Sequence, residues 1–262
     1  MRLRVLFAAC LLVLGACSPA PASGPLAGRH TPEAPESPPA AKAPPAKASR
    51  AKAPATAPTP ITYPAHGSRV WDRAPSQRGP VAGHAGTLLR YRVLVERDIR
   101  GLSAASFADT VTATLADPRG WTAGGRWRLE RVGPGDPYDI TIYLATPDTR
   151  DRLCGDVADG YTSCRNGDRV VLNVARWVKG VPDYGAGLTT YRRYVVNHEV
   201  GHRLGHRHEL CPGDGRPAPV MQQQTLGLHG CTANPWPYVQ GERYRGAPGA
   251  YDVEIPARDT GR

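Results

Sequence analysis

The sequence carries, between residues 198 and 208, the run His198-Glu199-Val200-Gly201-His202-Arg203-Leu204-Gly205-His206-Arg207-His208. On an α-helix, residues four positions apart lie on one face, so His198 and His202 can both turn an imidazole nitrogen toward one metal ion, at about 2.0–2.1 Å. Glu199 lies one residue further round the helix, displaced from the two ligands but close to a water molecule on that metal. The spacing therefore predicts a metal-binding helix with Glu199 as general base.

A glycine after the second histidine indicates how a third ligand reaches the same metal. Gly205 can adopt the left-handed conformation that ends a helix, and the chain can then turn back to bring His208 to the metal. His206 is an alternative ligand, but it follows Gly205 directly and has less room to turn back, so we favour His208. Three neutral histidines with one open coordination position are typical of catalytic zinc. The sequence therefore predicts one catalytic Zn²⁺ and hydrolysis of an amide bond without a covalent acyl-enzyme.

The run from 198 to 208 resembles the long zinc signature of the metzincin clan of metallopeptidases. The resemblance implies that three histidines bind zinc, that the glutamate is the base, and that a peptide or protein substrate binds in extended form beside an edge strand. The clan has a methionine turn below the zinc, and Met221 in Pro219-Val220-Met221 follows His208 at a compatible distance. Several members have a tyrosine two residues later, where this sequence has Gln223. The source of oxyanion stabilisation therefore stays open between Gln223, another side chain and zinc alone.

A second resemblance covers roughly residues 81–240. The runs HEVGHRLGH, CPG and PAPVMQQQT together are similar to a family of exported actinobacterial proteins, and this similarity brings no substrate with it. Two other functions stay open: a zinc amidase that acts on cell-envelope material with the same zinc and base, and a surface binding protein whose zinc is structural. Glu199 argues against the binding protein, because a structural zinc site has no use for a base.

Hydrophobic periodicity outside the run predicts an α+β domain. We expect helices from Ser103 to about Ala116 and from about Thr190 to Leu204, and strands at 88–96, 126–132, 138–144 and 169–174. No regular element is expected beyond Gly205. The clan resemblance makes this a zincin-like fold: a twisted mixed sheet with an active-site helix, followed by an irregular C-terminal subdomain that holds His208 and Met221.

Composition predicts an exported, lipid-anchored chain with one folded domain. Residues 1–17 have a basic start, an apolar run and Leu14-Gly15-Ala16-Cys17, which resembles a bacterial lipobox with Cys17 as the lipidated residue. An ordinary secretory signal and a membrane-retained anchor are the alternatives. We expect residues 18–80, rich in Pro and Ala, to be a disordered tether, 81–247 the folded domain, and 248–262 a flexible tail.

The net charge of +10 does not by itself indicate a nucleic-acid binder. Residues 1–80 carry ten Lys or Arg side chains against three Asp or Glu, so most of the excess lies before the expected domain. We interpret this as a basic tether that lies beside anionic lipid, with no nucleic-acid partner. The domain is expected to be a monomer.

Four cysteines remain in the expected domain: Cys154, Cys164, Cys211 and Cys231. An even number in an exported domain predicts two disulfides, and proximity in the sequence favours Cys154–Cys164 and Cys211–Cys231. A zinc site made of all four is the weaker alternative, because no two of them are separated by two residues. We expect the Cys211–Cys231 bond to hold the segment around Met221 in place and so to position His208.

Overall fold

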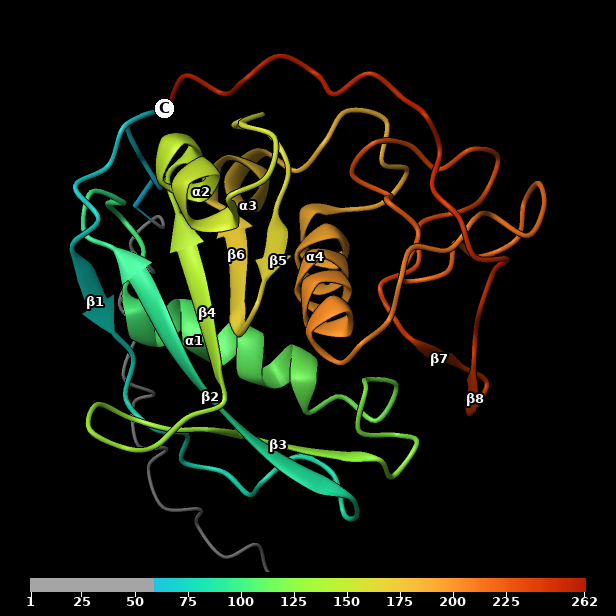
Figure 1. Cartoon of the computed structure of the whole chain (residues 1–262), viewed down its shortest axis with the longest axis horizontal. Coiled ribbons are helices and arrows are strands. Elements are labelled where there is room, and N and C mark those ends of the chain that lie inside the picture. The colour runs from blue at the N-terminus through green and yellow to red at the C-terminus, as the bar shows by residue number, and fades with distance from the viewer. Residues whose placement is uncertain (1–58) are drawn as a thin grey trace, which may run out of the picture. The chain divides into compact units, whose positions relative to one another are not determined.

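The computed structural model describes residues 59–262, which form an α+β domain built on a mixed sheet (Figure 1). The strands are β1 (Trp71–Arg73), β2 (Thr87–Glu96), β3 (Trp127–Arg131), β4 (Ile140–Ala145), β5 (Cys164–Asn166), β6 (Arg169–Asn173), β7 (Tyr238–Val239) and β8 (Glu242–Arg243). The helices are α1 (Ala104–Leu115), α2 (Pro147–Cys154), α3 (Val174–Lys179) and α4 (Leu188–Arg203). Within residues 59–262 no helix is long and apolar enough to cross a membrane.

The main sheet has the strand order β1-β2-β4-β6-β5, and β3 pairs with the first half of β2. Strands β2, β3, β4 and β6 run parallel, whereas β1 and β5, at the two ends of this order, are antiparallel to their neighbours. Alternate residues of β6 face opposite sides of the sheet. Val170 and Leu172 enter the main core with α1 and α4, whereas Val171 packs in a smaller cluster with the half-cystines Cys154 and Cys164.

The elements expected from periodicity are all present, with shifts of at most two residues at their ends, whereas the short strands β7 and β8 lie beyond Gly205, where no regular element was expected. The strand at 88–96 is β2, and those at 126–132, 138–144 and 169–174 are β3, β4 and β6. Helix α1 begins after Ser103, whose Oγ accepts a hydrogen bond from the Ser106 amide (3.1 Å). Helix α4 contains the histidine-rich run from His198 as far as Arg203. An α+β domain with a mixed sheet is therefore correct.

Two helices were missed: α2 because its sequence lacks an apolar period, and α3 because it has only six residues, directly after an apolar strand. Helix α2 reads PDTRDRLC, and it starts with Pro147 at a position where a proline fits the first turn. Helix α3 follows β6 without a break. Asn173 ends the strand and also caps the helix, since its side chain accepts a hydrogen bond from the Ala175 amide (2.9 Å).

The folded domain extends beyond 81–247 on both sides, which corrects the boundaries expected from composition. Before residue 81, β1 pairs with β2, and Tyr63 is buried. After residue 247, Asp259 is buried and accepts hydrogen bonds from the Tyr63 hydroxyl (3.2 Å) and Lys179 Nζ (2.8 Å). Composition missed these segments because polar and backbone contacts with distant residues, and few apolar side chains, hold them in place.

The expected signal segment 1–17, the lipidation residue Cys17 and the part of the expected tether before residue 59 lie outside the described residues. The described residues contain both disulfides favoured by sequence proximity, Cys154–Cys164 and Cys211–Cys231. A site formed by four cysteine ligands is thereby ruled out, because all four sulfur atoms are in disulfide bonds.

The ion pairs of Asp259 with Lys179 and Arg176 lead to a prediction about stability. We expect Asp259→Asn to lower the free energy of unfolding by about 1.5–3 kcal/mol, the range for hydrogen bonds to charged groups, because Asp259 faces Lys179 and Arg176 in a buried setting. Asp252→Asn, in an exposed part of the same segment, is the matched control. Urea unfolding of the two variants measures the difference, and equal stabilities would show that the segment is not held by Asp259.

The same interaction gives the effect a pH dependence. Burial raises the pKa of the Asp259 carboxyl, but the hydrogen bonds from Lys179 and the Gly261 amide outweigh burial and hold the pKa below its usual value. Because the folded-state pKa is lowered, the stabilisation is present above the unfolded pKa of about 3.9 and is lost as the pH falls through the folded pKa. The gap between wild type and Asp259→Asn should therefore close in acid.

Candidate metal centre

Buried tyrosines fix helix α4 in the core and so fix the side chains it carries. Tyr191 and Tyr194 are almost fully buried, and the Tyr194 hydroxyl donates a hydrogen bond to the Gln222 carbonyl (3.1 Å). His198 and Glu199 follow on the same buried stretch of the helix. The position of these two side chains is therefore set by packing of the whole helix.

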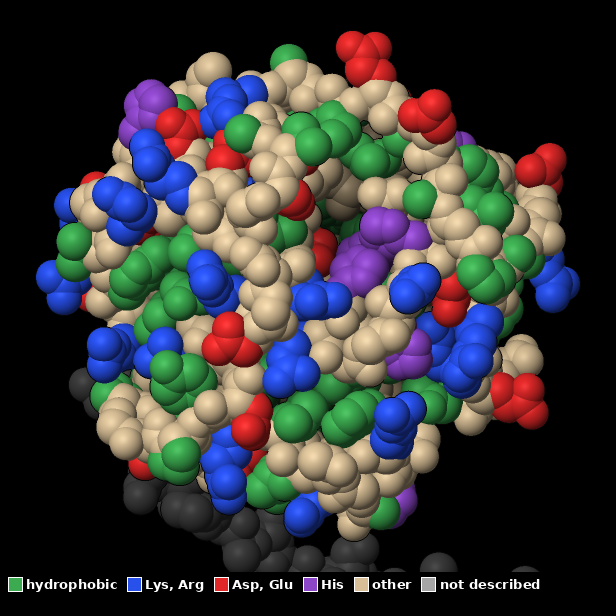
Figure 2. All heavy atoms as spheres, viewed as in Figure 1, with side chains coloured by type: hydrophobic (Ala, Val, Ile, Leu, Met, Phe, Trp, Pro, Cys, Tyr) green, Lys and Arg blue, Asp and Glu red, His purple; other side chains and the backbone are tan. Residues whose placement is uncertain are grey.

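The helix ends at Gly205 in the way the sequence predicts. Gly205 has φ = 93°, its amide donates to the His202 carbonyl (3.1 Å), and the His206 amide donates to the Gly201 carbonyl (3.0 Å). These two bonds form a Schellman motif, in which a left-handed residue reverses the chain at a helix end. The reversal returns His208 to the face of the helix that carries His198 and His202 (Figure 2 shows a group of histidine side chains in a hollow of this face).

The three predicted ligands converge. His202 Nε2 lies 3.2 Å from His198 Nε2 and 3.0 Å from His208 Nε2, and ligand atoms of all three residues lie within 4.8 Å of one another. Two nitrogens at about 2.0–2.1 Å from a tetrahedral zinc ion are roughly 3.3 Å apart. The spacing of the nitrogens therefore fits one zinc ion.

Backbone carbonyls set which imidazole nitrogen is free to bind a metal. His198 Nδ1 lies 2.9 Å from the Val220 carbonyl oxygen, and His202 Nδ1 lies 2.9 Å from the His206 carbonyl oxygen. A carbonyl can only accept, so each Nδ1 carries the proton and each Nε2 keeps its lone pair. Such hydrogen bonds on the far nitrogen are the usual means of orienting a metal-binding histidine.

Burial keeps the imidazoles in the neutral form that metal binding requires. It holds the pKa of His198 well below its usual value, assisted by the neighbouring His202 and His208. Burial also lowers the pKa of His202, and lowers the pKa of His208 to about 4. The three rings are therefore unprotonated at neutral pH, as ligands must be.

The side chain of His206, the alternative ligand, packs against Trp121. Its ring stacks on Trp121, with centroids 4.4 Å apart and an angle of 18° between the planes. Its contribution to the centre is the backbone carbonyl that accepts from His202 Nδ1. The position directly after Gly205 thus points the side chain away from the ligand group.

Met221 packs against the helix that carries His198 and His202. It is fully buried, and a Cβ atom added at Gly201 would lie 2.5 Å from Met221 Sδ and 2.6 Å from Trp121 Cζ2. The glycine between the two helix ligands therefore lets the methionine approach the helix backbone. The backbone of the same turn contacts the histidine group. The Val220 carbonyl accepts a hydrogen bond from His198 Nδ1, and the Met221 carbonyl accepts one from the amide of Glu209, the residue after His208 (3.1 Å).

Glu199 lies in a cavity of about 340 Å³ together with the three histidines. Its side chain is buried, and burial raises the pKa of the carboxyl to about 8, although the positive charge of Arg150 opposes this shift. A carboxyl with a pKa near neutrality can both take up and release a proton there, which is what a general base requires.

Of the three glutamines that follow Met221, only Gln223 lines this cavity. The Gln222 side-chain amide donates to the Gly227 and Leu228 carbonyls (3.1 and 2.9 Å), and the Gln224 amide donates to the Asn234 carbonyl (2.8 Å). Gln222 and Gln224 are therefore used in building the turn. Gln223 makes no side-chain hydrogen bond among residues 59–262 and remains a candidate for contacting substrate.

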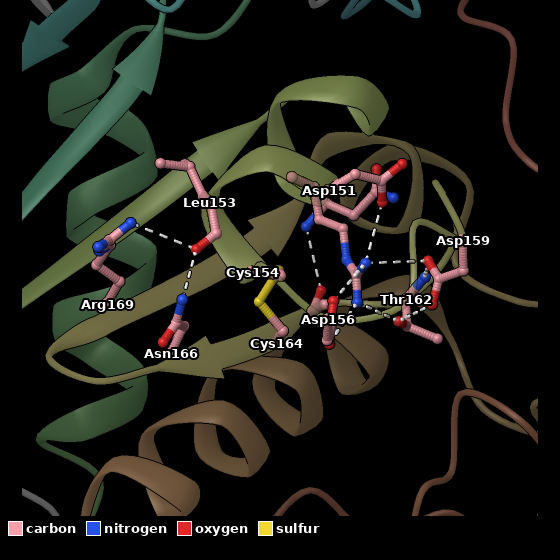
Figure 3. The surroundings of a disulfide bond; sticks show 12 residues. Asp151, Leu153, Cys154, Asp156, Asp159, Thr162, Cys164, Asn166 and Arg169 are labelled. Atoms are coloured by element: carbon pink, nitrogen blue, oxygen red, sulfur yellow. Dashed lines mark hydrogen bonds and ion pairs between the residues drawn. A yellow bond between two sulfur atoms is a disulfide. The ribbon is translucent and has the colours of Figure 1, made fainter.

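Sequence reasoning missed the charged wall of the cavity. Arg150 is buried and forms ion pairs with Asp151 (3.0 Å), Asp156 (3.2 Å) and Asp159 (3.5 Å). Figure 3 shows Asp156 and Asp159 grouped beside the Cys154–Cys164 disulfide, which closes the loop that carries them. The signal available was a pair of aspartates between the two cysteines, with Asp151 just before them, which gave no indication of a buried arginine partner.

Cys154, Asp156 and Cys164 also bring potential metal-binding atoms together. Their two sulfur atoms form a disulfide, so they have no thiolate to offer a metal. Within the described part of the chain, the three histidines are therefore the group with the chemistry of a zinc site.

His208 lies in the histidine group, whereas His206 stacks on Trp121, and this difference can be tested. We expect His208→Ala to weaken zinc binding by more than about 100-fold, beyond the 10–100-fold typical of losing a hydrogen-bond partner of a ligand, because it removes one of three donors. His206→Ala keeps the backbone carbonyl that orients His202, so its zinc affinity should stay close to wild type. Competition with a chromophoric chelator measures both, and a reversed ranking would assign the third ligand to His206.

Comparison with known proteins places the chain in a family but not beside a characterised relative. No curated protein and no solved structure matches it significantly. A family model described as "Protein of unknown function (DUF3152)" matches residues 57–231, which is more than half of the chain and includes all three histidines, Glu199 and Met221. The chain therefore belongs to the DUF3152 family.

Proposed function

We propose that the chain is a zinc-dependent endopeptidase that acts at the extracytoplasmic cell surface. The observation that carries this proposal is the convergence of His198, His202 and His208 on one point, beside the buried carboxyl of Glu199 and inside an open cavity. Three neutral imidazoles leave one coordination position for water or substrate, which is the arrangement of catalytic zinc sites.

Each residue of the centre has a role in this proposal. His198, His202 and His208 hold the ion through Nε2. A bound Zn²⁺ would supply Lewis acidity, lowering the pKa of water and polarising a substrate carbonyl. Glu199 takes the proton from the attacking water on its carboxylate and passes it to the nitrogen of the departing amine, so no side chain forms a covalent bond with the substrate.

The surroundings of the centre support a metzincin-like version of the zincin fold. The helix with two ligands ends in a left-handed glycine, the third ligand follows the reversal, and a buried methionine packs against the helix between its two ligands. Strand β5 is an antiparallel edge strand, and its Cys164 and Arg165 line the cavity. An extended peptide that pairs with β5 would run past the metal centre, with backbone hydrogen bonds that do not depend on its sequence.

The two disulfides are in keeping with an oxidising compartment outside the cytoplasm. We propose that export and lipidation at Cys17 deliver the domain there, that residues 18–58 tether it to the membrane surface as a basic segment, and that it acts as a monomer on peptide or protein substrates, with no nucleic-acid partner.

Replacement of the proposed base tests the mechanism. We expect Glu199→Gln to bind zinc as wild type does, because all three ligands remain, and to lose activity by about 10²–10⁴-fold, the usual contribution of general acid–base catalysis. The assay is a peptide library run in parallel with purified cell-wall material. Wild-type turnover of cell wall alone would favour the amidase, and activity in Glu199→Gln equal to wild type would exclude this mechanism.

A further inference from the structure

A second cavity adjoins the metal centre on the side where the chain leaves the ligand group. It has a volume of about 560 Å³, and its lining includes His202, His208, Arg165 and Arg207. Arg165 also lines the cavity that contains Glu199, so it lies where the two cavities meet. A substrate bound at the metal therefore has an adjacent space in which its next group can lie.

The opposite wall of this second cavity is formed by Pro248 and Gly249, in the segment that was expected to be a flexible tail. Backbone contacts hold this segment beside the third ligand. Glu209 and Pro248 form a β-bridge, and the Gly249 amide donates to the His208 carbonyl (3.1 Å). The cavity is therefore a built part of the domain, with a wall tied to the backbone of a ligand.

The charge of the second cavity is uncompensated. Arg165 and Arg207 are exposed, and neither has an ion pair or side-chain hydrogen bond within residues 59–262. No Asp or Glu lines the cavity. This contrasts with Arg150 in the neighbouring cavity, whose charge is met by three aspartates.

A further arginine lies on this side of the centre. The Arg243 guanidinium lies 5.0 Å from the ring of Trp121, on which His206 stacks, and it pairs with Glu209 (3.1 Å). Figure 2 shows Lys and Arg side chains beside the histidines, on the lower and right-hand rim of the hollow.

We propose that this second cavity is an anion subsite for the substrate: it receives a carboxylate close to the scissile bond, and Arg165 and Arg207 determine the preference. The inference rests on the proposed peptidase function and names its substrate class, peptides with an acidic group next to the cleaved bond. The guanidinium group suits this role, because its planar set of donors matches both oxygens of a carboxylate.

The carboxylate has two possible sources in a peptide, an acidic side chain and a free C-terminus. The test therefore uses peptide sets built around one cleaved sequence. One set carries Asp or its isostere Asn at each position near the scissile bond, with an amidated C-terminus. The other carries neutral side chains, with a free or an amidated C-terminus. The set in which the charged peptide is preferred identifies the source.

The first measurement is kcat/KM for each pair with the zinc-loaded full chain. We expect the charged peptide to exceed its neutral partner on the order of tenfold, as for one charge-assisted hydrogen bond at an exposed site. Arg165→Gln combined with Arg207→Gln should remove this preference, so the readout is the ratio of kcat/KM between the charged and the neutral peptide and not either value alone. The corresponding double Lys variant keeps both charges and should retain part of the preference.

Arg78→Gln is the control, because Arg78 is exposed, has no ion pair or side-chain hydrogen bond within residues 59–262 and does not line either cavity. It removes one positive charge, whereas the double Gln variant removes two, and it does not touch the subsite. A wild type without acidic preference, a double Gln variant that keeps the preference, or an equal loss in Arg78→Gln would each overturn the proposal.

A second measurement separates the subsite from the peptidase activity. Binding of the same peptides, fluorescently labelled, to the zinc-loaded Glu199→Gln chain is followed by anisotropy and needs no turnover. If no peptide is cleaved but the charged peptide binds more tightly and the double Gln change removes that difference, the peptidase proposal fails and the subsite stands. If peptides are cleaved and bound without regard to charge, the subsite fails and the peptidase proposal stands.

Discussion

The hydrogen bond from His198 Nδ1 to the Val220 carbonyl joins the two halves of the centre, and most of the surrounding structure serves to keep it in place. This hydrogen bond connects helix α4, whose buried face packs in the core, to the turn around Met221. That turn has little regular structure. The donor nitrogen is fixed as Nδ1, so Nε2 points into the cavity. The His206 carbonyl does the same for His202, and the Schellman motif at Gly205 places that carbonyl. Two ligands are thus oriented by the backbone, without any further side chain.

The irregular segment after residue 205 is ordered by polar contacts more than by apolar packing. The Cys211–Cys231 disulfide closes part of it, as expected, and buried side-chain amides hold the same segment through hydrogen bonds. Asn234 Nδ2 donates to the Ala218 carbonyl (2.9 Å), and Gln224 links Pro219 to Asn234. Each amide satisfies backbone groups that would otherwise be buried without a partner. The expectation that one disulfide holds the methionine turn was therefore incomplete.

Local patterns were sufficient for the framework of the fold and for the convergence of His198, His202 and His208. Helix α4 and strands β2, β3, β4 and β6 have clear periods, and the distance from Gly205 to His208 follows from the chemistry of a helix end. The rest depends on polar contacts that leave no periodic pattern in the sequence. Tyr63 and Asp259 are 196 residues apart, and Arg150 is buried while it pairs with Asp151, Asp156 and Asp159, which follow it closely. Neither partnership has a local signature, so composition assigned residue 63 to the tether and residue 259 to the tail.

The central claim is that three imidazoles of this chain bind one zinc ion through Nε2, with Glu199 beside it. The most direct test is a crystal structure of residues 59–262 grown with zinc, with anomalous data collected on both sides of the zinc absorption edge. The account predicts one strong anomalous peak at about 2.0–2.1 Å from Nε2 of His198, His202 and His208. A peak held by His206, or full zinc occupancy away from these histidines, would contradict it.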